Sequence, residues 1–91
     1  MKLHKYQIAD RVRHFVLKAI KGRHMTANQL TEEINKAGIV PHKRFPAETR
    51  DLLYRLQREG LVEFRTFSRD RRTGKPVRHY NRRRESIDET A

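Results

Sequence analysis

The sequence predicts a mainly α-helical domain in which three helices precede a small β-hairpin. Two observations carry this prediction. Residues 5–60 contain three amphipathic segments, each followed by a glycine, and residues 61–82 contain two short segments of alternating character around a polar turn. Ninety-one residues, 35% of them hydrophobic, are enough for one modest core, and the absence of cysteine excludes disulfides and thiolate metal sites.

The first helix is expected over residues 5–21. Its apolar side chains recur at three- and four-residue spacing and form one stripe, which consists of Ile8, Val12, Phe15, Val16, Ala19 and Ile20. Lys21 suits the negative end of the helix dipole, and Gly22 is a natural stop.

The second helix is expected to begin after Thr26. Thr26 and Gln29 have the spacing of a capping box, in which each side chain accepts the other residue's backbone N–H. The predicted inward face consists of Ala27, Leu30, Ile34 and Ala37. Gly38 ends the helix. Met25, which precedes the Thr26 cap, is placed to pair with the later hairpin.

The third helix is expected over residues 46–59, with Pro46 in the first turn, where its missing N–H costs nothing. The predicted inward residues are Thr49, Leu52, Leu53 and Leu56. The predicted exposed residues are Ala47, Glu48, Arg50, Asp51, Tyr54, Arg55 and Arg58. Gly60 closes the helix.

The first strand of the hairpin shows the two-residue alternation of a half-buried strand. Val62 and Phe64 alternate with Glu63 and Arg65. Phe67 falls in the opposite phase to Phe64, which predicts a bulge in the strand near Thr66.

The second strand follows a turn that spans residues 70–74, where Gly74 supplies a positive φ angle. Pro76 indicates an edge strand or a delayed strand start. The domain is expected to span residues 1–82, and residues 83–91, which lack periodicity, are expected to form a disordered tail.

Positive charge is concentrated near the C-terminus. The net charge is +11, and residues 61–84 carry nine Lys/Arg against two acids. Clustered cations attract a polyanion, because lysine and arginine placed on phosphates release condensed counterions. The alternative is that the charge serves solubility alone.

Three helices followed by a hairpin resemble the winged helix-turn-helix superfamily of DNA-binding regulators. The pattern is similar to the GntR and MarR type domains at the junction of the third helix and the first strand, which here contains Leu53, Leu56, Glu59, Gly60, Leu61 and Val62. The sequence departs from that pattern in its long connector, residues 38–45, and in Asp51, where a basic residue is common. By analogy, domains of this size are the kind carried by phages, plasmids and archaeal genomes.

The resemblance implies that the third helix enters the major groove of DNA. Its outward residues near the N-terminus are Ala47, Glu48, Arg50 and Tyr54. Arg50 is expected to pair with guanine, and Glu48 to accept from a cytosine amino group. In the alternative, Glu48 and Arg50 are the acid of the first turn and part of a solvated face, and Tyr54 covers the edge of the core.

The connector and the hairpin supply the expected phosphate contacts. Lys43 and Arg44 precede the third helix, and backbone N–H groups from Thr26 to Gln29 face a phosphate at the start of the second. The wing, meaning the hairpin with its turn, carries Arg69, Arg71, Arg72, Lys75 and Arg78. Arg71 or Arg72 fits a narrow minor groove, and Arg82, Arg83 and Arg84 extend this surface. The alternative is a basic loop that binds nothing.

No motif indicates an enzyme or a cofactor. The five histidines are scattered, and the sequence has no nucleophile motif and no glycine-rich phosphate loop. No apolar run is long enough to span a bilayer or to act as a signal peptide, so a cytoplasmic location without a membrane partner is expected.

The expected function is sequence-specific binding of double-stranded DNA by a small transcriptional regulator. A homodimer is compatible with this function, and no small-molecule ligand is evident. Two alternatives stay open: architectural DNA or RNA binding without base readout, and a winged-helix module that binds protein.

Overall fold

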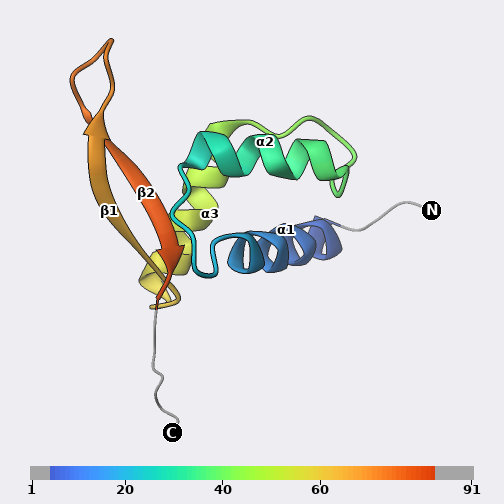
Figure 1. The fold of residues 1–91 in the computed structure, drawn as a ribbon. Coiled ribbons are helices and arrows are strands. Elements are labelled where there is room, and N and C mark those ends of the chain that lie inside the picture. The colour runs from blue at the N-terminus through green and yellow to red at the C-terminus, as the bar shows by residue number, and fades with distance from the viewer. Residues whose placement is uncertain (1–4, 84–91) are drawn as a thin grey trace, which may run out of the picture.

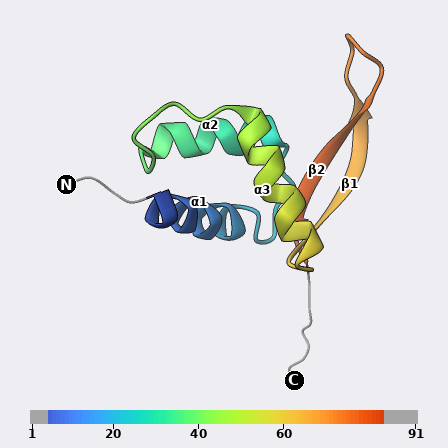
Figure 2. The same ribbon diagram turned by 180° about the vertical axis from the view of Figure 1, so that it is seen from behind.

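Three helices and an antiparallel hairpin make up the fold of the computed structural model, which describes residues 5–83. The helices are α1 (Lys5–Ala19), α2 (Ala27–Ala37) and α3 (Pro46–Arg58), and the strands are β1 (Val62–Arg69) and β2 (Pro76–Arg82). The hairpin stands beside the helices in Figure 1. Figure 2, the view from behind, shows α3 in front, running obliquely past the ends of α1 and α2 nearest the hairpin. This arrangement confirms the predicted fold class and is consistent with a winged-helix layout.

The core lies where the three helices meet the base of the hairpin. Its buried hydrophobic side chains are Val12, Val16, Ile20, Met25, Ala27, Leu30, Ile34, Leu53, Leu56, Val62 and Tyr80. The apolar stripe predicted for α1 supplies three of them, and the leucines of α3 supply two. None of the described helices is long and apolar enough to cross a membrane.

The helix ends agree with the predicted caps, apart from the end of α1. Thr26 Oγ1 accepts from the Gln29 N–H at 3.1 Å, and Gln29 Oε1 accepts from the Thr26 N–H at 2.9 Å. The first helix ends at Ala19 rather than at the predicted Lys21. The Lys21 N–H donates to the Lys18 carbonyl at 3.3 Å, three residues back instead of four, so the chain makes a tighter turn than an α-helix and leads into Gly22 at φ 74°.

One predicted core position is wrong. Ala37 is exposed, because it is the last residue of α2 and lies beyond the last buried position, Ile34. Thr31, which was not among the predicted inward residues of this helix, is buried.

The hairpin has the predicted irregularity and the predicted third partner. The strand register shifts between Thr66 and Ser68, which confirms the bulge, and Phe67 is the residue between them. Met25 forms an isolated bridge to Tyr80, with N···O distances of 2.9 and 2.7 Å. The hairpin is thus fastened to the turn before α2, as the sequence predicted.

The segment after β2 is described only at its start. The Arg83 N–H donates to the Leu61 carbonyl at 2.9 Å. The rest of the predicted tail, residues 84–91, lies outside the described residues.

Candidate nucleic-acid interface

Three elements meet around one hollow of about 310 Å³, here called the inner hollow. Thr26 and Asn28 line it from the start of α2, Arg50 from α3, and Arg78 from β2. The sequence predicted a role in DNA binding for each of these elements. The structure brings Arg50 and Arg78 to one site with the N-terminal end of α2.

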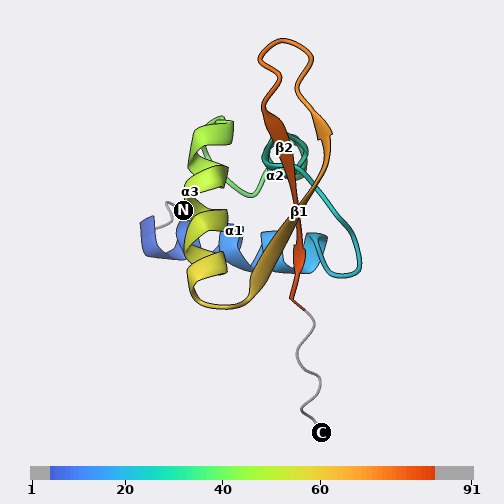
Figure 3. The same cartoon turned by 90° about the vertical axis from the view of Figure 1, so that its left-hand side faces the viewer.

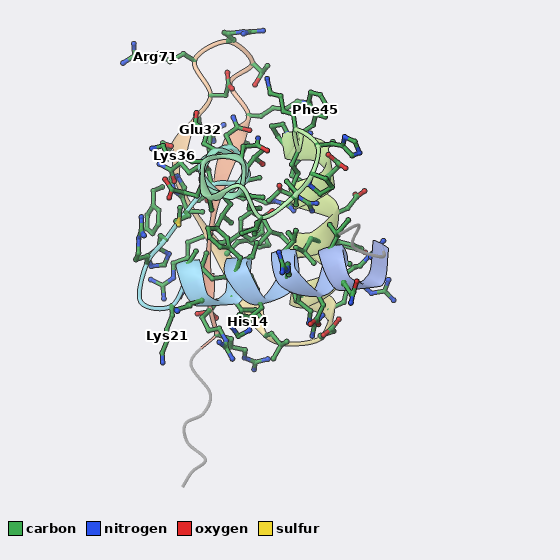
Figure 4. The ribbon with its side chains drawn as sticks, turned by 90° about the vertical axis from the view of Figure 1, so that its right-hand side faces the viewer. His14, Lys21, Glu32, Lys36, Phe45 and Arg71 are labelled. Atoms are coloured by element: carbon green, nitrogen blue, oxygen red, sulfur yellow. The ribbon has the colours of Figure 1, made fainter. Side chains whose placement is uncertain are left out.

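The N-terminal end of α3 and the tip of the wing lie at the same end of the molecule. Figure 3 shows both rising on the side away from α1. In Figure 4 the labelled side chains of Phe45 and Arg71 lie at that end, with His14 and Lys21 at the other. The start of α3 and the wing tip, together called the candidate surface here, thus lie at one end of the molecule.

The outward face of α3 has the predicted composition. Ala47, Glu48, Arg50 and Tyr54 are all exposed. The Arg58 guanidinium lies 5.7 Å from the centre of the Tyr54 ring, a cation–π distance, so Tyr54 has a partner along its own helix.

Glu48 has a structural role in the first turn of α3. Its Oε1 accepts from the Phe45 N–H at 2.8 Å and so satisfies a backbone group at the helix start. This contact matches the alternative reading of Glu48 as the acid of the first turn. One carboxylate oxygen remains for another donor.

Arg44 is half-buried and bonded to neighbouring segments, whereas Lys43 is exposed. The Arg44 Nε donates to Thr49 Oγ1 at 3.2 Å, and Nη2 donates to the Glu48 carbonyl at 3.1 Å. The Asn35 side chain bonds to both backbone groups of Arg44: its Oδ1 accepts from the Arg44 N–H at 2.8 Å, and its Nδ2 donates to the Arg44 carbonyl at 3.0 Å. Burial lowers the pKa of Arg44, and the nearby Glu48 carboxylate opposes this effect. Arg44 thus fastens the connector to α2 and α3.

The wing presents its cations from an ordered turn. Asp70 Oδ1 accepts from the N–H groups of Arg72 and Thr73 at 2.7 and 3.1 Å. The Gly74 N–H donates to the Asp70 carbonyl at 2.8 Å, and Gly74 has the predicted positive φ, 73°. These bonds order the backbone of the turn and leave the exposed side chains of Arg71 and Arg72 directed outward.

The other wing cations differ in how they are held. Arg69 Nη1 donates to the Gly74 carbonyl at 2.9 Å. The Arg78 guanidinium lies 4.5 Å from the centre of the Phe64 ring, which holds it over the inner side of the hairpin. Lys75 is exposed.

Positive charge on this surface is not cancelled by ion pairs within residues 5–83. The one salt bridge found there joins Arg13 to Glu59, which are in α1 and at the end of α3. The wing cations therefore remain available to an anionic ligand.

Sequence reasoning missed two side chains of this surface, those of Phe45 and Asn28, although it had included the Asn28 backbone in the start of the second helix. Phe45 is 58% exposed at the start of α3, although phenylalanine is usually a core residue. Lys43 Nζ lies 6.0 Å from the centre of its ring. Asn28 follows the Thr26 cap, and only the wing's position shows that it faces a hollow.

The described residues contain no group of three His, Cys, Asp or Glu side chains that could hold a metal ion. No model of a known protein family matches the chain, and no curated protein matches it either.

Proposed function

We propose that this protein binds double-stranded DNA sequence-specifically and acts as a small cytoplasmic transcriptional regulator of winged-helix type. The observation that carries the proposal is the convergence of Arg50, Arg78 and the start of α2 on the inner hollow. The major groove of B-DNA, about 12 Å wide, admits a helix such as α3. The wing then lies against the flanking phosphates.

Roles within the proposed interface follow from chemistry. Arg50 reads a base, because a guanidinium forks onto guanine O6 and N7. Arg71 and Arg72 contact phosphates or the minor groove from the wing tip, where their side chains are exposed. A two-fold dimer would match a palindromic site, and a monomer a single half-site.

Selection of bound sequences from random duplexes, using the full chain, tests the proposal. We expect one enriched motif. Retention of duplexes without a motif would favour the alternative, binding without base readout, in which the wing cations act and α3 is incidental. Absence of duplex binding at low salt would refute both.

Two arginine variants test the division of roles. Arg50→Ala is expected to cost about 1–3 kcal/mol on the selected site and to relax the preference at one base pair. Arg72→Ala is expected to weaken all sequences alike and to lower the salt slope by about one. Arg11→Ala, an exposed arginine of α1, is the matched control. Equal losses for Arg50→Ala and Arg72→Ala on every duplex would contradict the assignment.

A further inference from the structure

The hairpin has a second face, turned away from the helices. Directly opposed residues of an antiparallel pair share one face. Phe64 is paired with Tyr80, which is buried in the core, whereas Arg65 is paired with His79 and Glu63 with Asn81 on the other face. Figure 3 looks onto the hairpin, with α1 and α2 behind it and α3 beside it.

An exposed aromatic ring stands on this outer face. The bulge places Phe67 between His24 and His79, with ring centres 5.1 Å apart in both pairs and interplanar angles of 87° and 63°. The two histidines hold the ring by edge-to-face contacts, yet the side chain remains 58% exposed. An apolar ring is therefore presented to solvent from an ordered strand.

Beside this ring lies a basic hollow of about 440 Å³, here called the outer hollow. Its cations are Lys21 from the turn after α1, Arg65 from the outer face of β1, and Arg82 and Arg83 from the end of β2. Arg82 is paired with the buried Val62, so it lines the hollow from the strand end and not from the outer face. The one carboxylate in its lining is Glu63, and no ion pair within residues 5–83 involves any of these residues. The excess of positive charge makes the outer hollow attractive to phosphate groups.

His24 joins the ring to the outer hollow. It lines the hollow and also touches Phe67, so the aromatic and the cationic parts form one continuous surface. Asn81, also in the lining, has a buried Oδ1 that bonds to no described residue. Its Nδ2 is engaged, because it donates to the Arg82 carbonyl at 3.3 Å.

We propose that the outer face of the hairpin binds a single strand of nucleic acid, with one base stacked on Phe67 and the adjoining phosphates in the outer hollow. The bases of a duplex are stacked on one another and cannot reach an aromatic ring on a β-ribbon, whereas an unpaired base can. An acidic peptide would use the cations alone and leave the ring without a role. This site is separate from the inner hollow and does not depend on base readout by α3.

The test uses the full chain and two fluorescent probes of equal length, oligo-dT and the same backbone without bases, at about 0.15 M salt. The wild-type protein is expected to bind oligo-dT roughly tenfold more tightly than the abasic strand, because stacking on an aromatic side chain favours the base. Phe67→Leu keeps an apolar side chain without the ring and should remove this preference. Phe67→Tyr should keep it.

A charge variant separates the two parts of the site. Arg65→Gln is expected to weaken the oligo-dT and abasic strands by the same factor, which leaves their ratio unchanged. Arg11→Gln, on the exposed surface of α1, is the control for loss of one charge.

Equal binding of the two strands by the wild-type protein would overturn the proposal, as would a base preference that survives in Phe67→Leu. Poly-glutamate is added to each complex as a competitor. If it displaces both strands equally well from the wild-type protein and from Phe67→Leu, the ring has no role in binding, and the face is assigned to acidic peptides. The duplex selection has no influence on these outcomes, so failure of this site and failure of the proposed duplex binding are distinguishable. Thermal melting of Phe67→Leu shows whether the variant is folded.

Discussion

Two threonine hydroxyls 2.7 Å apart in the interior join α2 to α3. Thr31 Oγ1 also lies 2.7 Å from the Ala27 carbonyl, and Thr49 Oγ1 accepts from Arg44. Each hydroxyl has one hydrogen, so all contacts are satisfied when Thr49 donates to Thr31 and Thr31 donates to Ala27. This chain of bonds sets the placement of α3 against α2.

Loss of the Thr49 hydroxyl should therefore destabilise the fold. Thr49→Val leaves the Arg44 Nε without its acceptor and the buried Thr31 oxygen without a donor, and we expect the free energy of unfolding to fall by about 1–3 kcal/mol. Urea denaturation measures it. Thr66→Val, at an exposed strand position, is the matched control and should change stability little. Equal stability of the two variants would contradict the network.

The exposed ring of Phe45 yields a second prediction at this scale, which depends on the proposed function. Phe45 lies at the leading end of α3, where an apolar side chain meets the methyl group of thymine. Replacing single thymines of the selected duplex by uracil removes that methyl group. One such replacement should weaken the wild-type protein several-fold, by loss of about 1 kcal/mol for one buried methyl, and should leave Phe45→Ala unaffected.

The affinities of the wild-type protein and of Phe45→Ala are measured for the thymine and the uracil duplex. The effect of the methyl group is the difference between the two duplexes for each protein, so a general loss of affinity in Phe45→Ala does not affect the comparison. Identical sensitivity of the two proteins at every thymine would exclude this contact.

Side-chain roles of this kind were the least predictable part of the protein. Thr49 was expected to face inward, but its partners Thr31 and Arg44 come from other segments. Asn35 and Arg44 are nine positions apart across a connector, so no local sequence pattern predicts their contact. Arg44 was predicted to touch phosphate, and its internal bonds depend on the path of that connector. Whether it also meets DNA remains a prediction.

Whole elements were predicted more completely, because residues close together in the sequence determine where a helix begins and ends. Thr26 and Gln29 begin α2, Pro46 begins α3, and Gly38 and Gly60 take φ angles of 66° and 80° after the helices. The C-terminal end of α1 was predicted at Lys21 and lies at Ala19, where the chain tightens into the turn before Gly22. Ala37 was predicted to face inward and is exposed, because α2 ends at this residue.

The contact between α1 and the end of α3 leads to a prediction about pH. Arg13 Nη1 donates to Glu59 Oε2 at 3.0 Å, and Nη2 donates to Oε1. This hydrogen bonding lowers the pKa of Glu59 below its ordinary value of 4.5, and the attraction of the Arg13 charge adds to it. The folded state therefore favours the ionised form, and the stabilisation is present above pH 4.5 and lost as the pH falls through the lowered pKa.

Thermal unfolding across this pH range tests the contact. Glu59→Gln should lower the melting temperature slightly at neutral pH and not at acid pH, where the wild-type carboxyl is protonated as well. The pair is solvent-exposed, so we expect a small difference. Glu63→Gln, an exposed glutamate of β1 without an ion pair among the described residues, serves as the control.

At the scale of the molecule, the uneven charge predicts a strong dependence of duplex binding on salt. Five wing cations that each neutralise one phosphate would make the logarithm of the binding constant fall with the logarithm of salt concentration at a slope of about −4 to −5. The double variant Arg71→Gln/Arg72→Gln should reduce the slope by about two. Fluorescence anisotropy at several salt concentrations measures it, and a slope that the double variant leaves unchanged would place the DNA elsewhere.

The bridge between Met25 and Tyr80 has a mechanical consequence. It ties the base of the ribbon to the residue that directly precedes the cap of α2, so a sideways force on the arginine tip is transmitted to the helix start instead of being absorbed at a hinge. A ligand bound at the tip is therefore held by a hairpin whose base is joined by backbone hydrogen bonds to the residue before α2.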